Sequence, residues 1–286
     1  MQNSRIKQYK DMSKPKVLFI SQEISPYVCE SEIAKKCKSI PYGISERGKE
    51  VRLFMPNFGC INERRNQLHE VIRLSGMNII INDTDHPLII KVASLPSARI
   101  QVYFIDNEEY FHKKLVLRDK NDVFYPNNDE RALFFARGVI ETIKNLGWAP
   151  DIIHCHGWMS HLIPLYVKRM FKDNPLFTDS KVVFSFYNDE FPEPLSPSFV
   201  DNLVFDGIPV ADQKHFKTPT YISTMKSAAD FSDALIVGSE NLHPEVRTYL
   251  SQLSKPMLAY NTEENFVNLV NDFYDEMMVS SNVLIK

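Results

Sequence analysis

Short apolar runs alternate with amphipathic stretches along most of the chain. The runs are four to six residues of mainly Val, Ile, Leu and Phe, which is typical of strands buried on both faces of a sheet. Amphipathic stretches between them predict helices up to about Gly48, over 161–171 and over 221–231. This alternation predicts an α/β fold with a parallel sheet and helices on both faces. The predicted strands are KVLFI (16–20), VRLFMP (51–56), DIIHC (151–155), KVVFSF (181–186) and ALIVGS (234–239).

The pattern changes between residues 71 and 105. Three apolar segments follow one another there without helical spacing, which predicts a β-meander inserted into the α/β framework. The segments are VIRLSGMNIIIN, PLIIKVASL and RIQVYFID.

Residues 128–147 carry the clearest helical signal. Asn128 is a candidate N-cap, acidic residues occupy the first turn, and Gly147 is a candidate stop. One apolar stripe joins Leu133, Ala136, Ile140, Ile143 and Gly147.

Two further segments complete the predicted organisation. The proline-containing stretch 188–219 predicts a long irregular loop, and its acidic start, NDEFPEP, indicates a solvated loop or a contact for a basic partner. Near the end, Phe266, Leu269, Val270, Phe273 and Met277 follow helical spacing. We therefore predict a flexible leader over 1–14, one domain over 15–260, and a closing helix with a tail over 261–286.

Composition narrows the functional classes. The 286 residues are 44% hydrophobic and 24% charged with a net charge of -3, which argues against a nucleic-acid binder. No apolar run approaches the roughly 20 residues of a membrane span, and the polar N-terminus lacks the apolar region of a secretory signal. The four cysteines form no CxxC pair, so we expect reduced thiols and a cytoplasmic protein.

In a parallel α/β sheet, ligands bind beyond the carboxyl ends of the strands. The first such loop, SPYVCESEIAKK (25–36), contains no glycine. Its Cys29 is either a reactive thiol at a helix start or a small filler residue. The neighbouring Glu30 and Glu32 favour the second reading, because acidic neighbours raise a thiol pKa.

Histidines and aromatic residues cluster in the later strand-end loops. His154, His156 and His161 could suggest zinc, but no carboxylate or thiolate completes a ligand set, so a structural role is favoured and no metal is expected. The aromatic side chains offer either a stacking surface for a sugar ring or core packing. They are Trp158, Phe186, Tyr187 and Phe191.

Several stretches together resemble the N-terminal half of the bacterial glycogen and plant starch synthases. The resemblance runs from about residue 16 to 250. It implies the Rossmann-like N-terminal domain of a GT-B glycosyltransferase of family five, which transfers glucose from ADP-glucose to an α-1,4-glucan. No cofactor is implied beyond this donor substrate. The stretches are KVLFISQEISPY, ISERGKEVRLFMPNFG, VYFIDNEEYF, YPNNDERALFFARGVIETIKNLGWAPDIIHCHGWMSHLIPLYVK, KVVFSFYN and MKSAADFSDALIVGSENLHPEV.

The resemblance also implies site residues, and this chain departs from them. The family carries Lys-x-Gly-Gly-Leu in the first loop, where the lysine and the glycines meet donor phosphate. Here Cys29 stands for the lysine, Ser31 and Glu32 for the glycines, and Ile33 for the leucine. Because a glutamate opposes anion binding at a helix N-terminus, the loop is predicted to have lost its phosphate site.

Two more motifs differ from the family pattern. Gly157 replaces an aspartate in HCHGW (154–158), and Tyr187 replaces the histidine of a His-Asn pair. The resemblance therefore leaves His156, Trp158, Tyr187 and Asn188 as candidate substrate-binding residues, with Cys29, Gly157 and Tyr187 as altered catalytic positions.

Two functional hypotheses follow. In the first, the chain is a glucan synthase, active alone or with a separately encoded GT-B C-terminal half, because residues 254–286 are too few for a second Rossmann-like domain. In the second, it is a non-catalytic half that binds α-glucan or a partner in glycogen metabolism. An exposed strand-end face would suit a partner or a homodimer.

Overall fold

The structure, a computed structural model, describes residues 14–28, 31–96, 98–112, 114–262 and 265–282. Its centre is one sheet with the strand order β10-β9-β8-β7-β1-β2-β6-β5-β3, and β4 pairs with β5 outside this path. Seven strands run parallel: β1 (Lys16–Ser21), β2 (Glu50–Pro56), β6 (Ile100–Asp106), β7 (Ile152–His156), β8 (Lys181–Phe186), β9 (Ala234–Val237) and β10 (Met257–Leu258).

The predicted meander is confirmed, because β4, β5 and β6 pair antiparallel in chain order. Strands β4 (Met77–Ile81) and β5 (Thr84–Leu95) form an antiparallel hairpin through Asn82 and Asp83, which both have positive φ, and β3 (His69–Glu70) pairs with β5. Strand β6 is the third strand of the meander, antiparallel to β5, and it also pairs parallel with β2, so it joins the meander to the central sheet. The run of buried residues from Val102 to Asp106 explains this placement, because a strand covered on both faces needs no polar alternation.

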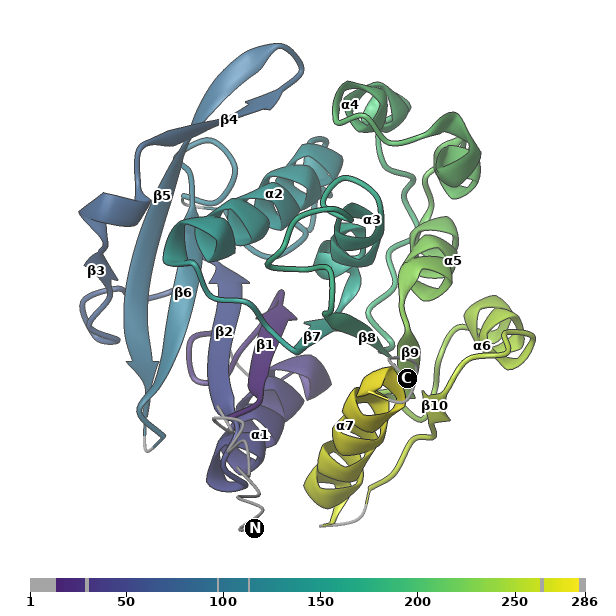
Figure 1. The fold of residues 1–286 in the computed structure, drawn as a ribbon. Helices are drawn as coiled ribbons and strands as arrows, with labels where there is room; N and C mark the ends of the chain where they lie inside the picture. Colours follow the sequence, from purple (N-terminus) through teal and green to yellow (C-terminus); the bar gives the residue numbers. More distant parts are fainter. Residues whose placement is uncertain (1–13, 29–30, 97, 113, 263–264, 283–286) are drawn as a thin grey trace, which may run out of the picture.

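Helices cover both faces of the sheet (Figure 1). Helices α2 (Asn128–Leu146) and α3 (Leu162–Lys168) pack on one face. Helices α1 (Glu32–Glu46) and α7 (Phe266–Asn282) lie side by side on the other. Helices α4 (Phe199–Phe205) and α5 (Tyr221–Phe231) follow β8, and α6 (Pro244–Ser251) follows β9. The predicted parallel α/β fold with helices on both faces is confirmed.

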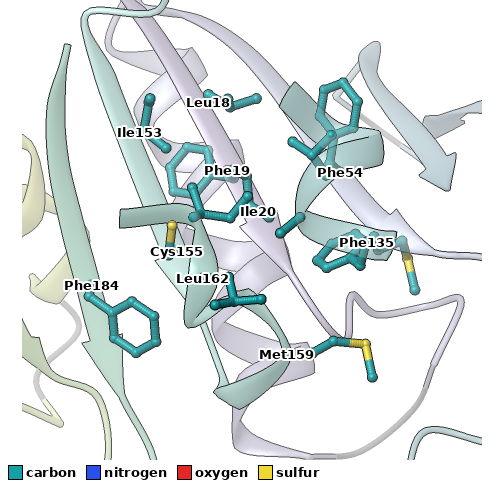
Figure 2. Packing of buried hydrophobic residues seen from close by; sticks show 14 of the residues in the cluster. Leu18, Phe19, Ile20, Phe54, Phe135, Ile153, Cys155, Met159, Leu162 and Phe184 are labelled. Carbon is teal, nitrogen blue, oxygen red and sulfur yellow. The ribbon is translucent and has the colours of Figure 1, made fainter. Parts of the chain in front are cut away.

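The core lies between these layers. Leu18, Ile20 and Cys155 of the central strands are at most 1% exposed, and Figure 2 shows them with Met159 and Leu162 packed around them. Such complete burial of neighbouring strand residues is what the uninterrupted apolar runs predict.

Helix α2 begins one residue differently from the prediction. Its N-cap is Asn127, whose side chain makes no capping hydrogen bond, and Asn128 is the first helical residue. The buried Asn128 side chain donates instead to the Leu117 carbonyl at 2.9 Å. The predicted stop is confirmed, because Gly147 caps the helix in the left-handed conformation.

The segment 188–219 is more ordered than an irregular loop. It contains helix α4 (Phe199–Phe205) and the 3₁₀ helix η3 (Val210–Phe216). The Phe199 and Phe216 rings meet with centroids 5.2 Å apart and both are buried. Elements of one or two turns are too short to produce a readable helical period, so the sequence analysis missed them.

The helix predicted near the C-terminal end is α7. Phe266, Val270, Phe273 and Met277 are buried, as is Tyr274. The predicted leader, except for its last residue, and the last four residues of the tail lie outside the described residues. No helix among the described residues is long and apolar enough to cross a membrane.

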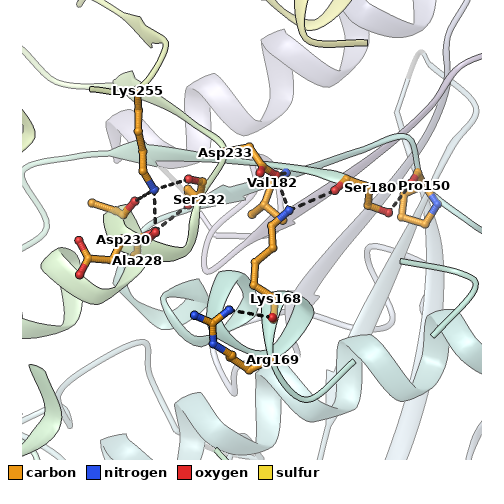
Figure 3. A network of polar contacts seen from close by, with 11 residues as sticks. Pro150, Lys168, Arg169, Ser180, Val182, Ala228, Asp230, Ser232, Asp233 and Lys255 are labelled. Atoms are coloured by element: carbon orange, nitrogen blue, oxygen red, sulfur yellow. Dashed lines mark hydrogen bonds and ion pairs between the residues drawn. The ribbon is translucent and has the colours of Figure 1, made fainter. Parts of the chain in front are cut away.

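A polar network holds the amino-terminal edge of the sheet together (Figure 3). Lys168 Nζ donates to Asp233 Oδ2 at 2.6 Å, and the same oxygen accepts from the Val182 amide at 2.7 Å. Lys255 Nζ donates to three carbonyl oxygens at the end of α5 and just beyond it. Each cation here has acceptors within the fold, so the network is structural.

Candidate functional site

A cavity of about 320 Å³ opens at the opposite edge, beyond the carboxyl ends of β1, β7, β8 and β9. This is where ligands bind in open parallel sheets. Four of the lining residues are acidic, and within the described residues no lysine or arginine lines the cavity. The lining comprises Gln22, Glu23, Ser31, Glu32, Ile33, Val116, Leu117, Trp158, Tyr187, Asn188, Asp189, Glu190 and Ser239.

The first crossover loop closes on itself through Ser31. The Ser31 hydroxyl accepts from the Ala34 amide at 2.9 Å as the N-cap of α1, and it donates to the Glu23 carboxylate. A helix N-terminus attracts anions. Here the carboxylates of Glu23 and Glu32 already supply that negative charge. Cys29 and Glu30 lie outside the described residues.

Glu32 connects this loop to two others. Its carboxylate accepts a hydrogen bond from the Ser239 hydroxyl, and the same hydroxyl accepts from the Asn188 amide at 3.2 Å. The start of α1 is therefore joined to the ends of β8 and β9 through one serine. Asn188 itself stays exposed at the cavity mouth.

One lysine, Lys36, pairs with this cluster from outside the cavity lining. Lys36 Nζ donates to the Gly238 carbonyl at 2.7 Å, and it lies 4.7 Å from the ring centroids of both Tyr260 and Phe266. Its distance to the Glu32 carboxylate is 3.6 Å. Burial lowers the Lys36 pKa, and the lysine does not line the cavity.

Gly157, the predicted altered catalytic position, lies beneath Gln22. Its φ of 78° belongs to the region that favours glycine. A Cβ atom at this position would lie 2.5 Å from Gln22 Oε1, which accepts from the Met159 amide at 3.2 Å. No larger residue fits at 157 while Gln22 keeps this position.

A carboxylate from another loop reaches the same turn. Asp189 Oδ2 accepts from the Trp158 amide at 2.8 Å, and the Tyr221 hydroxyl lies 3.0 Å from Asp189 Oδ1. Burial raises the Asp189 pKa to about 7, although both hydrogen bonds favour the ionised form. Asp189 was not among the predicted site residues.

Tyr187 and His156 form a buried pair. The Tyr187 hydroxyl lies 2.9 Å from His156 Nδ1, and its ring covers Gly238. Both side chains are at most 2% exposed. Burial lowers the His156 pKa to about 3, so this histidine is neutral near neutral pH.

His154 and His161 are also neutral structural residues. His154 bonds Tyr274 of α7 and the Ser185 hydroxyl, whereas His161 Nδ1 bonds the Trp158 carbonyl. Burial lowers both histidine pKa values, that of His161 to about 4. Within the described ranges no group of three or more metal-ligating side chains is placed to hold an ion.

Comparison with known proteins gives the family. Residues 16–255 match the starch synthase catalytic domain. The chain belongs to this family. A glycogen synthase of Chlorobium limicola is 42% identical over 174 residues, covering 60% of this chain and 36% of that protein. A glycogen synthase of Chlorobium chlorochromatii is 35% identical over 254 residues, covering 81% of this chain and 51% of that protein.

A solved structure supports the fold. The catalytic domain of starch synthase IV from Arabidopsis thaliana, bound to ADP and acarbose, matches with a TM-score of 0.70 and 17% identity, covering 86% of this chain and 51% of that one. The predicted relationship to glycogen and starch synthases and the GT-B type of fold are therefore confirmed. The chain spans about a third to a half of the length of these curated relatives.

In this member of the starch synthase family, the predicted substrate-binding residues differ in how far they are exposed to the cavity. Asn188 is exposed at the cavity mouth, whereas Trp158 and Tyr187 show the cavity only small parts of buried rings. His156 does not line the cavity. The alternative of an aromatic stacking surface is not supported, because the four candidate rings of Trp158, Phe186, Tyr187 and Phe191 are at most 3% exposed.

Four polar cavity residues, besides Asp189, were missed as site residues. Gln22 and Glu23 follow the first strand, Glu190 follows Asp189, and Ser239 ends the run ALIVGS. Their positions in strand-end loops were the available signal. The predicted site residues came from positions with a known role in the family. These four residues are not at such positions, so they were not predicted.

Proposed function

We propose that this chain is a non-catalytic GT-B lobe that binds α-glucan at the strand-end cavity and does not transfer glucose from ADP-glucose by itself. The observation that carries the proposal is the charge of the cavity, with four carboxylates and no described lysine or arginine in its lining. A diphosphate would have to approach Glu23 and Glu32 with no lysine or arginine among the described lining residues, because Lys36, which pairs with Glu32 at 3.6 Å, lies outside the lining.

The polar lining suits a neutral polyol better than an anion. Carboxylates are hydrogen-bond acceptors, and the side-chain amides of Gln22 and Asn188 add both acceptors and donors. Sugar hydroxyls donate to such acceptors without bringing negative charge. The volume is at the lower end of the range for small-ligand sites, so one or two sugar rings fill the cavity.

The competing proposal is an active synthase completed by a GT-B C-terminal half on another polypeptide. The openness of the strand-end edge and the partial coverage of the relatives are compatible with it. The apolar dimer face expected at this edge has less support, since the strongly exposed large apolar side chains of the described residues do not line the cavity. We place the protein in the cytoplasm, where glucan would be available to it.

Calorimetric titrations test the non-catalytic proposal on the chain by itself. The chain is expected to bind maltoheptaose and to release no heat with ADP-glucose under the same conditions. A parallel assay follows glucose transfer from ADP-glucose to maltoheptaose. Turnover, or ADP-glucose binding in the micromolar range, would contradict the non-catalytic assignment.

A further inference from the structure

Two glycines lie directly beneath side chains of the cavity. A Cβ atom at Gly157 would lie 2.5 Å from Gln22 Oε1, and one at Gly238 would lie 2.6 Å from Tyr187 Cε1. Both distances are shorter than real contacts of a Cβ atom. Gln22 and Tyr187 line the cavity, whereas neither glycine does. The two side chains therefore fill the space at the inner end of the cavity.

Both side chains are fixed in place. Gln22 is 3% exposed and accepts from the Met159 amide, and Tyr187 is 2% exposed and bonds His156. The Tyr187 carbonyl also accepts from the Tyr221 hydroxyl at 2.8 Å. Side chains held by packing and by hydrogen bonds form a rigid boundary for a ligand.

We propose that Gln22 and Tyr187 are specificity-determining residues that form the floor of the cavity and hold a glucan at its mouth. This inference rests on the proposed glucan binding. The bound ring then lies between Leu117 on one side and Asn188 and Glu190 on the other, and it does not reach the backbone above Gly157 and Gly238.

The mouth has the chemistry that such a ring needs. Val116 and Leu117 provide half-buried apolar surface, while Asn188 and Glu190 are exposed polar groups on the facing loop. A pyranose ring combines a C–H face with hydroxyl donors, and ligand sites generally pair apolar walls with a few polar groups.

The first experiment tests the floor without any sugar. The Tyr187→Gly substitution removes the equivalent of one p-cresol molecule, so the folded variant is expected to bind p-cresol, as seen by calorimetry and in crystals. Tyr187→Phe keeps the ring and is the matched control that should exclude p-cresol, as should the unaltered chain. A Tyr187→Gly variant with an unchanged circular dichroism spectrum that binds no p-cresol would overturn the floor assignment.

The second experiment tests selectivity with maltotriose and glucose as probes. Opening the floor gives a single ring a deeper seat, which maltotriose reaches only by moving its other rings away from their contacts at the mouth. Tyr187→Gly should therefore lower the ratio of maltotriose affinity to glucose affinity at least threefold. An unchanged ratio, or a crystal of the unaltered chain with a sugar ring against Gly238, would overturn the proposal. If the unaltered chain binds neither sugar, the proposed function fails, and the p-cresol result still decides the floor assignment.

Discussion

Charged side chains at the two edges of the central sheet differ in their partners. At the amino-terminal edge, Lys168 and Lys255 are each met by carboxylate or carbonyl oxygens of the fold, so charge stabilises the chain itself. At the carboxyl-terminal edge, Glu23 and Glu32 accept from serine hydroxyls, and Lys36 pairs with Glu32 at 3.6 Å. Both carboxylates line a cavity that has no described lysine or arginine in its lining. Charged side chains whose partners lie within the fold stabilise the structure. Charged side chains that face a cavity indicate a ligand site, or a site that has been lost.

The largest expected effect lies at the amino-terminal edge. Replacing Asp233 with alanine leaves the Lys168 ammonium and the Val182 amide without their shared acceptor, which should lower the free energy of unfolding by about 1–3 kcal/mol. Urea unfolding measures this change. Asp212→Ala, which removes the partner of the more exposed Arg169, is the control with a smaller expected effect.

Maltoheptaose binding by Asp233→Ala should equal that of the unaltered chain, because the two edges are on opposite sides of the sheet. A large loss of glucan affinity with little loss of stability would break the distinction between the edges.

A second prediction neutralises two charges at the strand-end edge. The double substitution Glu23→Gln and Glu32→Gln removes two negative charges near the N-terminus of α1 and keeps the side-chain shapes. If each charge is worth about 0.3–1 kcal/mol there, ADP affinity should rise about threefold to thirtyfold. Calorimetry at low salt measures it, with Glu46→Gln at the far end of α1 as the control. Equal ADP affinity in all three proteins would show that these carboxylates do not oppose phosphate.

A third prediction concerns pH. The Asp189 pKa is raised to about 7 from its ordinary value near 4, so the folded state binds this proton more tightly than the unfolded state does. This contribution is fully present below about pH 4 and is lost as the pH rises to about 7.

The Asp189→Asn substitution removes the titrating carboxyl and therefore the loss of stability that accompanies its ionisation as the pH rises. The variant should gain stability relative to the unaltered chain between pH 5 and pH 8, on the order of 1 kcal/mol after allowance for partial exposure. The buried histidines act oppositely, since their lowered pKa values cost stability as the pH falls below about 6.5, and the comparison of the two proteins cancels that effect. A stability difference that is constant with pH would show that Asp189 titrates normally.

The smallest effect is expected at the cavity rim. Arg118 donates to both carboxylate oxygens of Glu193, at 2.7 and 2.6 Å, and so joins the two loops that frame the mouth. The pair is partly exposed, so a double-mutant cycle with Arg118→Gln and Glu193→Gln should give a coupling in unfolding that is smaller than the effect of Asp233→Ala and close to the error of the measurement. A coupling as large as the effect of Asp233→Ala would make this rim part of the structural framework.

The sequence predicted the framework much better than the site. Local apolar runs identify strands such as Lys181–Phe186. The position of Gly147 after a helical apolar stripe identifies the end of a helix. The parallel pairing of β6 depends on which strand it meets, and the cavity depends on contacts such as Ser239 with Glu32, 207 residues apart. Long-range contacts of this kind leave no local periodic pattern.

The central claim is that the α1 N-terminus already carries its own negative charge and therefore rejects a diphosphate, while the cavity mouth accepts a neutral sugar. The most direct measurement is a crystal structure of the chain soaked with both ADP and maltotriose. Sugar density against Asn188 and Glu190, with no diphosphate near Ser31, is the predicted result. An ordered diphosphate bound to the backbone amides of Glu32 and Ile33 would contradict it.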